Sequence, residues 1–259
     1  TNIDLDFPSV GATENIILAS VYADGITKIS NAAMEPEIVD LAKFLNKMGA
    51  KIEGAGTNII KITGVEKLKD VSYSIMPDRI EAGTLLCAVA ITGGKVKLNK
   101  VIPEHINQIL NKLEQTGCEI KIENKCVCLK APKKIKAVDI KTMPYPGFPT
   151  DLQSPLMAVL AALPGESRIC ERVFEARYKI VEELRKMGAD ITVTGEEALV
   201  RGRSLQGAAL TARELRGGAA LCIAAAAAQG KSRILQYPFI ARGYENIIRD
   251  LQALGVVIH

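Results

Sequence analysis

The sequence predicts an α/β protein built from copies of one unit of about 70 residues, with its helices buried together and its sheets facing outward. Three observations lead to this fold class. Two series of glycines recur with the same period. Each copy contains a stretch that is apolar almost all round, which is typical of a buried helix. Each such stretch is followed by short segments of alternating hydrophobicity, which are typical of strands.

The glycines define the repeat. The first series ends each apolar stretch and comprises Gly25, Gly94, Gly165 and Gly230, with spacings of 69, 71 and 65 residues. The second series ends each amphipathic stretch and comprises Gly49, Gly117, Gly188 and Gly255, with spacings of 68, 71 and 67 residues. Because two independent landmarks keep one period, four copies are expected. Solenoid repeats are mostly shorter, at roughly 20 to 50 residues, so we expect these copies to close around a shared helical core.

Each copy is read in the same order. An apolar helix comes first, at residues 12–23, 80–91, 152–163 and 215–228. A strand follows, at residues 26–29, 95–98, 167–170 and 232–235. An amphipathic helix is next, at residues 36–48, 104–116, 178–187 and 244–254, and its glycine is the expected left-handed cap.

A hairpin completes each unit. Its second strand is expected at residues 58–63, 126–130 and 198–201, whereas the fourth copy ends at GVVIH after one hairpin strand. The chain begins with Thr, and its first apolar helix follows after only about ten residues. We therefore expect an N-terminal part of the natural protein to be missing from this chain.

The composition narrows the class of protein. The chain has 259 residues, enough for one large domain or two smaller ones. Its net charge is only +4, without a basic block, and Trp is absent, so the composition does not indicate nucleic-acid binding. The longest apolar run, residues 217–228, is too short to cross a bilayer.

The cysteines do not indicate a metal site. They are Cys87, Cys118, Cys126, Cys128, Cys170 and Cys222, with no Cys-x-x-Cys pair, and the chain has only two histidines. The ligands for zinc are therefore too few and wrongly spaced. Reduced thiols, which we expect to be small core residues, indicate a cytoplasmic protein.

Polar turns precede the four apolar helices. They are residues 7–11, 76–79, 148–151 and 211–216. Free backbone N–H groups and the positive end of the dipole make a helix start suitable for anions. For any single turn the ordinary alternative is an N-cap of Ser, Thr or Asp. Arg79 and Arg216 gain nothing from capping, which favours an anion site.

Two further arginines occupy matching places in the repeat. Arg177 and Arg242 each follow the first-series glycine of their copy by 12 residues, at a helix start where a cation opposes the dipole. Together with Arg79 and Arg216, they form a candidate cluster for carboxylate and phosphate groups. Asp151, next to Thr150, is expected to stay ionised among them and to accept a proton from a substrate hydroxyl.

Several longer stretches carry a resemblance. They include FPSVGATENIILAS, MPDRIEAGT, PGFPTDLQSP, VFEARYKIVEELRKMGA, LRGGAAL and ARGYENIIRDLQALG. Together they resemble the enolpyruvyl transferase family over essentially the whole chain. The resemblance implies two lobes, each an inside-out α/β barrel of three units. Residues 1–75 would be the incomplete last unit of the first lobe, and residues 76–259 the three units of the second.

The most similar branch of the family transfers the enolpyruvyl group of phosphoenolpyruvate to the 3-hydroxyl of UDP-N-acetylglucosamine, at the first committed step of peptidoglycan synthesis. The resemblance implies that Asp151 deprotonates this hydroxyl and that Arg242 is a second catalytic residue. The implied substrate-binding residues are Phe7, Pro8, Ser9, Val10, Gly11, Glu35, Arg79, Thr150, Val173, Arg177 and Arg216. It implies no cofactor, no metal, no nucleic acid and no membrane, and a monomer or weak oligomer.

The chain departs from the family in places. The family's Lys-Asn pair and its loop with a reactive cysteine are absent, and Glu214 stands where the family usually has Asp. The chain alone is therefore expected to be inactive. Two alternatives stay open: the branch that acts on shikimate 3-phosphate, and a non-catalytic binding module that kept the fold.

Overall fold

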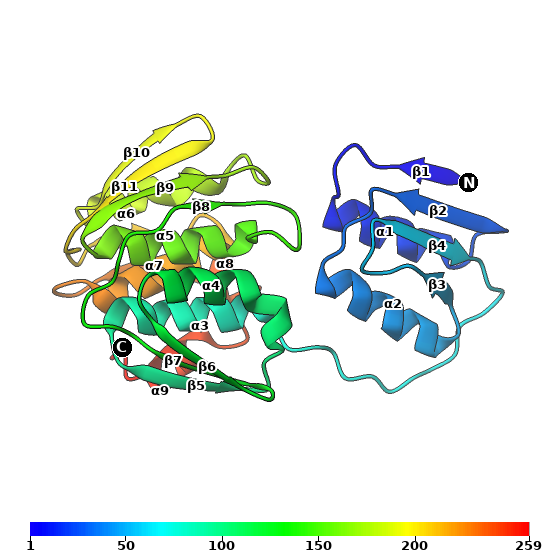
Figure 1. Cartoon of the computed structure of the whole chain (residues 1–259), viewed down its shortest axis with the longest axis horizontal. Coiled ribbons are helices and arrows are strands. Elements are labelled where there is room, and N and C mark those ends of the chain that lie inside the picture. The colour runs from blue at the N-terminus through cyan, green and yellow to red at the C-terminus, as the bar shows by residue number, and fades with distance from the viewer. Residues whose placement is uncertain (259) are drawn as a thin grey trace. The chain divides into compact units, whose positions relative to one another are not determined.

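The computed structural model describes residues 1–258, and the chain divides into two compact units (Figure 1). Unit 1 comprises Thr1–Met76 with Pro144–Pro146, and unit 2 comprises Pro77–Met143 and the chain from Gly147 onward. Each unit is described by itself. The assignment of these parts to repeat units of two lobes stays a prediction.

Unit 1 contains one four-stranded sheet and two helices. Its elements are β1 (Asn2–Asp4), α1 (Val10–Ser20), β2 (Ile26–Ser30), α2 (Pro36–Met48), β3 (Lys51–Glu53) and β4 (Ile59–Thr63). The strand order is β1-β2-β4-β3, with β1 parallel to β2 and the other pairs antiparallel. Ile29, Ile38 and Ile60 are fully buried between the sheet and the helices, and form the core together with Ile17 of α1.

Helix α1 is less buried than its composition predicts. Only Thr13, Ile17 and Ser20 are buried, while Leu18 is 51% exposed and Tyr22, two residues beyond the helix, is 60% exposed. The expectation that each apolar helix is buried on most sides is therefore wrong for α1. The physical reason is that unit 1 holds no second apolar helix that could cover this face.

Unit 2 repeats the same order of elements three times. The first set is α3 (Arg79–Thr92), β5 (Lys95–Asn99), a 3₁₀ turn (Pro103–Ile106), α4 (Asn107–Gln115), β6 (Glu119–Glu123) and β7 (Cys126–Lys130). The second is β8 (Ile140–Lys141), a 3₁₀ turn (Thr150–Leu152), α5 (Gln153–Ala162), β9 (Gly165–Cys170), a 3₁₀ turn (Arg177–Ile180), α6 (Val181–Lys186), β10 (Asp190–Thr194) and β11 (Glu197–Gly202). The third is β12 (Ala209–Thr211), α7 (Leu215–Ala227), β13 (Arg233–Leu235), α8 (Pro238–Ala241) and α9 (Ile247–Ala253).

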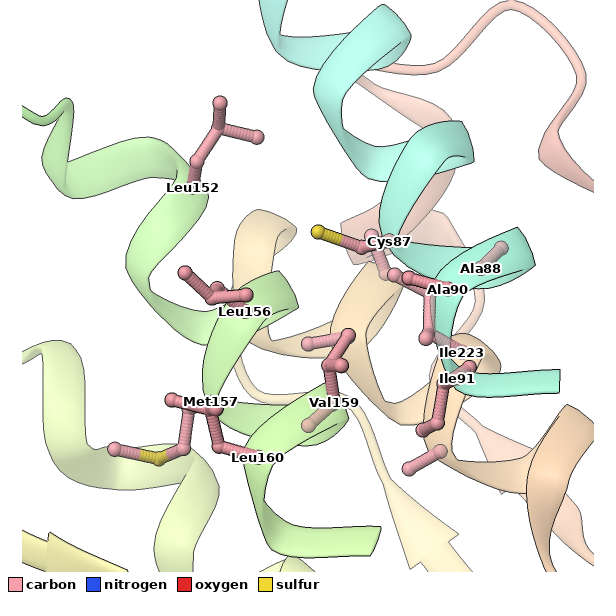
Figure 2. Close-up of a cluster of buried hydrophobic side chains, with 14 of the residues drawn as sticks. Cys87, Ala88, Ala90, Ile91, Leu152, Leu156, Met157, Val159, Leu160 and Ile223 are labelled. Carbon is pink, nitrogen blue, oxygen red and sulfur yellow. The ribbon is translucent and has the colours of Figure 1, made fainter. Parts of the chain in front are cut away.

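The three apolar helices α3, α5 and α7 pack against one another at the centre of unit 2. Figure 2 shows Cys87 of α3 with Leu156 and Val159 of α5 in this core. Small residues allow the close approach: a Cβ at Gly83 of α3 would lie 2.6 Å from the side chain of Leu152. The sheets have the orders β5-β7-β6, β10-β11-β9-β8 and β12-β13. The prediction of apolar helices buried together is confirmed for unit 2.

Some predicted details are wrong. The last amphipathic helix begins at Ile247 instead of residue 244, because Asn246 caps it through a hydrogen bond from the N–H of Arg249. Residues 256–258 form no strand, contrary to the hairpin strand expected there. All six cysteines are free thiols, but only Cys87 and Cys118 are fully buried, so the other four are not core residues.

Candidate functional site

The acidic turn before α5 lies at the centre of a charge cluster in unit 2. The 3₁₀ turn of Thr150–Leu152 presents the Asp151 side chain, which is 36% exposed. Its Oδ1 accepts a hydrogen bond from Nη2 of Arg177 at 2.8 Å. Its Oδ2 accepts from Nε of Arg216 at 3.0 Å and lies 2.9 Å from Nη2 of the same guanidinium. One carboxylate therefore joins two arginines from different copies of the repeat.

Arg177 is held from several sides. It begins the 3₁₀ turn that follows β9, and its side chain is only 6% exposed. Its Nε donates to Oγ1 of Thr150 at 3.1 Å, and its guanidinium lies 4.6 Å from the ring centroid of Phe174. Nη1 is also 3.7 Å from Oε2 of Glu214. A buried cation with this many partners has a fixed position.

Arg216 lies in the first turn of α7, whose N-cap is Glu214. The Glu214 carboxylate accepts the N–H groups of Arg216, at 2.8 Å, and Gly217. The Glu214 side chain therefore serves the ordinary capping role. Nη1 of Arg216 is buried and has no hydrogen-bond partner among residues 1–258. A donor left in this way is costly unless a ligand satisfies it.

The charge of Arg216 is secure. Burial, the strongest influence, lowers its pKa, but the carboxylate of Asp151 and the side chain of Tyr244 more than offset that effect, so the pKa lies above its ordinary value. Two fixed guanidinium groups can bind a phosphate or carboxylate bidentately. The carboxylate oxygens of Asp151 keep further lone pairs beyond these contacts, with which they can accept a proton.

The structure brings together four of the predicted residues: Thr150, Asp151, Arg177 and Arg216. Arg79 is buried at the start of α3, directly after the N-cap Asp78. Arg242 is exposed at the end of α8, and its side chain makes no ion pair or hydrogen bond within the part of the chain that is described. The predicted cluster of four arginines therefore shows only Arg177 and Arg216 around Asp151.

Val173 lies in the loop between β9 and Arg177. Its N–H donates to Oε1 of Glu171 at 3.0 Å, and the N–H of Phe174 donates to the same oxygen, also at 3.0 Å. The hydroxyl of Thr142 is a third donor to it, at 2.7 Å. Glu171 therefore fixes the backbone of the loop, and this carboxylate was not recognised in the sequence.

Two aromatic residues near the cluster also escaped the sequence analysis. Phe174 covers the guanidinium of Arg177, and Tyr244 lies with its ring centroid 5.6 Å from that of Arg216. The available signal was their position, since Phe174 precedes Arg177 by three residues and Tyr244 follows Arg242 by two.

The predicted residues of unit 1 lie at the start of its two helices. Oγ of Ser9 caps α1 by accepting the N–H of Ala12 at 3.2 Å, next to the exposed Phe7 and partly buried Pro8. Val10 and Gly11 form the first turn of α1. This turn therefore shows the capping role that was the ordinary alternative.

Glu35 lies directly before α2. Its Oε1 accepts the N–H of Tyr145 at 3.3 Å, while Oε2 is buried and has no hydrogen-bond partner among the described residues. Burial, followed by the charges of Glu37 and Glu35, raises the pKa of the neighbouring Glu14. The start of α2 is thus crowded with carboxylates.

Two further searches cover the described residues only. Residues 1–258 contain no group of three or more His, Cys, Asp or Glu side chains arranged to hold a metal ion. Within the same residues, every helix is too short or too polar to cross a membrane.

The chain is similar to known proteins over nearly its whole length. The sequence profile of the family described as EPSP synthase (3-phosphoshikimate 1-carboxyvinyltransferase) matches residues 1–251. The chain is 51% identical over 258 residues to UDP-N-acetylglucosamine 1-carboxyvinyltransferase 1 of Caldanaerobacter subterraneus subsp. tengcongensis, covering 99% of this chain and 62% of that protein. It is 50% identical to UDP-N-acetylglucosamine 1-carboxyvinyltransferase 1 of Symbiobacterium thermophilum, covering 100% of this chain and 59% of that protein.

Solved structures share the fold. The enolpyruvyl transferase NikO from Streptomyces tendae superposes with a TM-score of 0.88 at 26% identity, covering 100% of this chain and 64% of that chain. An EPSP synthase from Acinetobacter baumannii superposes with a TM-score of 0.76 at 21% identity, covering 100% of this chain and 63% of that chain. The predicted α/β fold is confirmed. The chain spans only 59% to 62% of the length of these two curated relatives.

Proposed function

This chain belongs to the EPSP synthase family of enolpyruvyl transferases, and we propose that it contributes to transfer of the enolpyruvyl group of phosphoenolpyruvate to the 3-hydroxyl of UDP-N-acetylglucosamine, with release of phosphate. This reaction would be the first committed step of peptidoglycan synthesis. The choice of acceptor is supported by identities of 50% and 51% to relatives with this name. The single observation that carries the proposal is the carboxylate of Asp151 held between Arg177 and Arg216.

The two arginines bind the anionic substrate in this proposal. Arg177 and Arg216 present fixed positive charge to the phosphate and carboxylate of phosphoenolpyruvate, and Nη1 of Arg216 gains the partner that it otherwise lacks. Preorganised cations of this kind stabilise negative charge that develops during the reaction.

Asp151 acts as the base. It takes the proton of the sugar hydroxyl while the oxygen forms a bond to C2 of phosphoenolpyruvate and C3 gains a proton from another donor. Loss of a proton from C3 then expels phosphate from C2 and restores the double bond. Thr150 supports this step through its hydrogen bond to Arg177. Arg242 remains a proposed second catalytic residue, since it is an exposed cation near the same end of the chain.

The remaining predicted residues are assigned to substrate binding. In unit 1 these are Phe7, Pro8, Ser9, Val10, Gly11 and Glu35, proposed for the sugar nucleotide. In unit 2, Val173 is proposed to contact the same substrate, because the Glu171 carboxylate fixes its backbone. Arg79 is proposed to bind an anionic group.

One other acceptor is supported by a specific observation. The family profile is described by its action on 3-phosphoshikimate, so shikimate 3-phosphate is the alternative substrate. A non-catalytic binding role is the second alternative, because the chain spans 62% of the length of the Caldanaerobacter relative.

A chimera tests these readings. Residues 1–258 of this chain would replace the matching 62% of the Caldanaerobacter relative, and phosphate release from phosphoenolpyruvate would be followed with each acceptor. We expect turnover with UDP-N-acetylglucosamine and none with shikimate 3-phosphate. The reverse preference would favour the alternative enzyme, and binding of the sugar nucleotide without turnover would favour the non-catalytic module.

Asp151→Asn in the chimera tests the base. The substitution keeps the size of the side chain but removes the group that accepts the proton, so we expect kcat to fall by about 10² to 10⁴, the usual contribution of general base catalysis. Asp190→Asn is the matched control, because Asp190 pairs with Arg203 on β10 and has no proposed role. A near-normal kcat in Asp151→Asn would refute the assignment.

A further inference from the structure

The guanidinium of Arg216 has a second neighbour besides Asp151. The ring of Tyr244 lies 5.6 Å from it, within the range of a cation–π contact. Tyr244 precedes α9 and is only 2% exposed, so water does not screen this contact. The ring and the carboxylate together engage Arg216, while Nη1 has no hydrogen-bond partner among residues 1–258.

The ring of Tyr244 is itself fixed by a hydrogen bond. Its hydroxyl lies 2.9 Å from Oγ1 of Thr84, which is fully buried in α3. A Tyr hydroxyl restrained at its far end cannot let the ring rotate away from the guanidinium. Three elements distant in sequence therefore meet here: Thr84 from α3, Arg216 from α7, and Tyr244 from the segment before α9.

The backbone beside Tyr244 is fitted closely to the residue before Arg216. A Cβ at Gly243 would lie 2.5 Å from the side chain of Leu215, so only glycine allows this approach. The segment that carries the ring is therefore held against the start of α7 by packing as well as by the hydroxyl.

Filling of the core alone does not explain this pair. Phenylalanine and valine would occupy nearly the same volume as Tyr244 and Thr84 without any polar atoms. Burying two hydroxyl groups has a desolvation cost, which their mutual hydrogen bond only offsets. What the hydroxyl pair adds is a defined orientation of the ring next to a site arginine.

We infer that Tyr244, fixed by Thr84, is a positioning residue that holds the guanidinium of Arg216 so that Nη1 stays directed to a phosphate or carboxylate group of the substrate. This inference rests on the proposed function, since it names how one of its anion-binding arginines is kept in place. Tyr244 touches no reacting atom in this assignment and acts only through Arg216.

The test uses the whole chain and the exchange of arginine Nε–H protons, measured by ¹⁵N NMR at mildly acidic pH. Nε of Arg216 donates to Asp151, and Nε of Arg177 donates to Thr150, so both protons are protected in the wild type. Arg177 is the internal reference, because a general loosening of unit 2 affects both arginines. Inorganic phosphate is then titrated as the anionic probe.

Tyr244→Leu removes the ring. We expect exchange at Arg216 to rise by about tenfold relative to Arg177, and phosphate affinity to fall by about the same factor, as for loss of a desolvated cation–π contact. Tyr244→Phe and Thr84→Val each remove one hydroxyl, so a smaller rise of about threefold is expected for each. The double variant should add little, because both changes break one bond.

A rise confined to Arg216 supports the inference. No rise, or an equal rise at Arg177, overturns it. Should Tyr244→Leu fail to fold, the two hydroxyl variants decide by the same criterion. Tyr73→Phe is the matched control, since its hydroxyl donates to Asp40 in unit 1 at 2.8 Å, and it should leave Arg216 unchanged.

The phosphate titration separates this inference from the proposed function. If phosphate shifts neither arginine signal in the wild-type chain, the proposed anion site is wrong, and the exchange rates still decide whether Tyr244 positions Arg216. If phosphate binds but the Tyr244 variants leave Arg216 exchange unchanged, the anion site stands and the positioning role is overturned.

Discussion

Helix α1 of unit 1 and the helices α3, α5 and α7 of unit 2 have the same kind of sequence but different surroundings. Leu18, Cys87, Ala158 and Ile223 each stand seven residues before the first-series glycine of their copy. Leu18 is 51% exposed, whereas the other three are completely buried. In unit 2, three such helices cover one another, while unit 1 contains one.

The difference shows what an apolar sequence does and does not determine. Composition determines that such a helix has no polar face to present to water. Burial depends on how many similar helices are present to pack against it. The following predictions test this comparison, beginning with the largest expected effect.

Truncation of a core leucine should have the largest effect. Leu156→Ala in α5 leaves a cavity among the three helices, so we expect unit 2 to lose about 2–5 kcal/mol of unfolding free energy. Leu18→Ala in α1 is the matched change, and as an exposed position it should cost no more than about 0.5 kcal/mol. Denaturant-dependent hydrogen exchange of amides in each helix measures both values. Equal costs would contradict the comparison.

Thiol reactivity should differ strongly between matching positions. Burial, followed by the nearby Cys118, raises the pKa of the Cys87 thiol, so little thiolate forms and reagents cannot reach it. A Leu18→Cys variant places a thiol at the equivalent exposed position of α1. We expect alkylation there to be at least about a hundredfold faster than at Cys87, because Cys87 requires local unfolding. Site-resolved mass spectrometry after iodoacetamide treatment measures the ratio, and similar rates would break the comparison.

Adding a methyl group should have opposite signs in the two regions. At Gly83 of α3 a Cβ would meet Leu152 at 2.6 Å, so Gly83→Ala should cost about 1–3 kcal/mol by overpacking. At Gly11 of α1 nothing lies within 4 Å of a Cβ, so Gly11→Ala should stabilise by about 0.4–1 kcal/mol. Thermal unfolding of the two variants is the measurement. A destabilised Gly11→Ala would show that α1 is covered after all.

The smallest expected effect concerns pH. Burial, then the charges of Asp78 and Asp250, raises the pKa of Glu81 in the first turn of α3 to about 6, from an ordinary value of 4.5. The folded state therefore binds more protons than the unfolded state between these values, and stability falls as pH rises through them. Glu81→Gln should remove this dependence and stabilise unit 2 at neutral pH, by at most about 1 kcal/mol because solvent screens the partly buried group.

Glu14 in α1 gives the comparison for this effect. Burial, followed by Glu37 and Glu35, raises its pKa in the same direction. Glu14→Gln should therefore change the pH dependence of unit 1 with the same sign. Urea unfolding at several pH values measures both variants, and a stability that rises with pH between 4.5 and 6 in the wild-type unit 2 would contradict the shift at Glu81.

Much of the fold follows from the repeat. The bounds predicted for α2 agree with the structure, because its amphipathic spacing and the Gly49 cap are local signals. The meeting of Asp151, Arg177 and Arg216 was predicted from their places in the repeat register. The exposed face of α1 was not, since hydrophobicity does not count the neighbours a helix will have.

The details of the site that were missed depend on tertiary contacts. Tyr244 approaches Arg216 only because the chain folds the segment before α9 onto α7, and no local spacing encodes this contact. The carboxylate of Glu171 fixes the loop of Val173 through Thr142, from a distant segment. Arg242 occupies the predicted place in the repeat, but register alone did not place its side chain beside Asp151.

The most direct test of the account is titration of the whole chain with phosphoenolpyruvate, followed at the arginine Nε–H signals. We predict that the signals of Arg177 and Arg216 shift together and saturate, while that of Arg203, which pairs with Asp190 on the surface, does not move. Absence of a shift at Arg177 and Arg216, or an equal shift at Arg203, would contradict a specific anion site around Asp151.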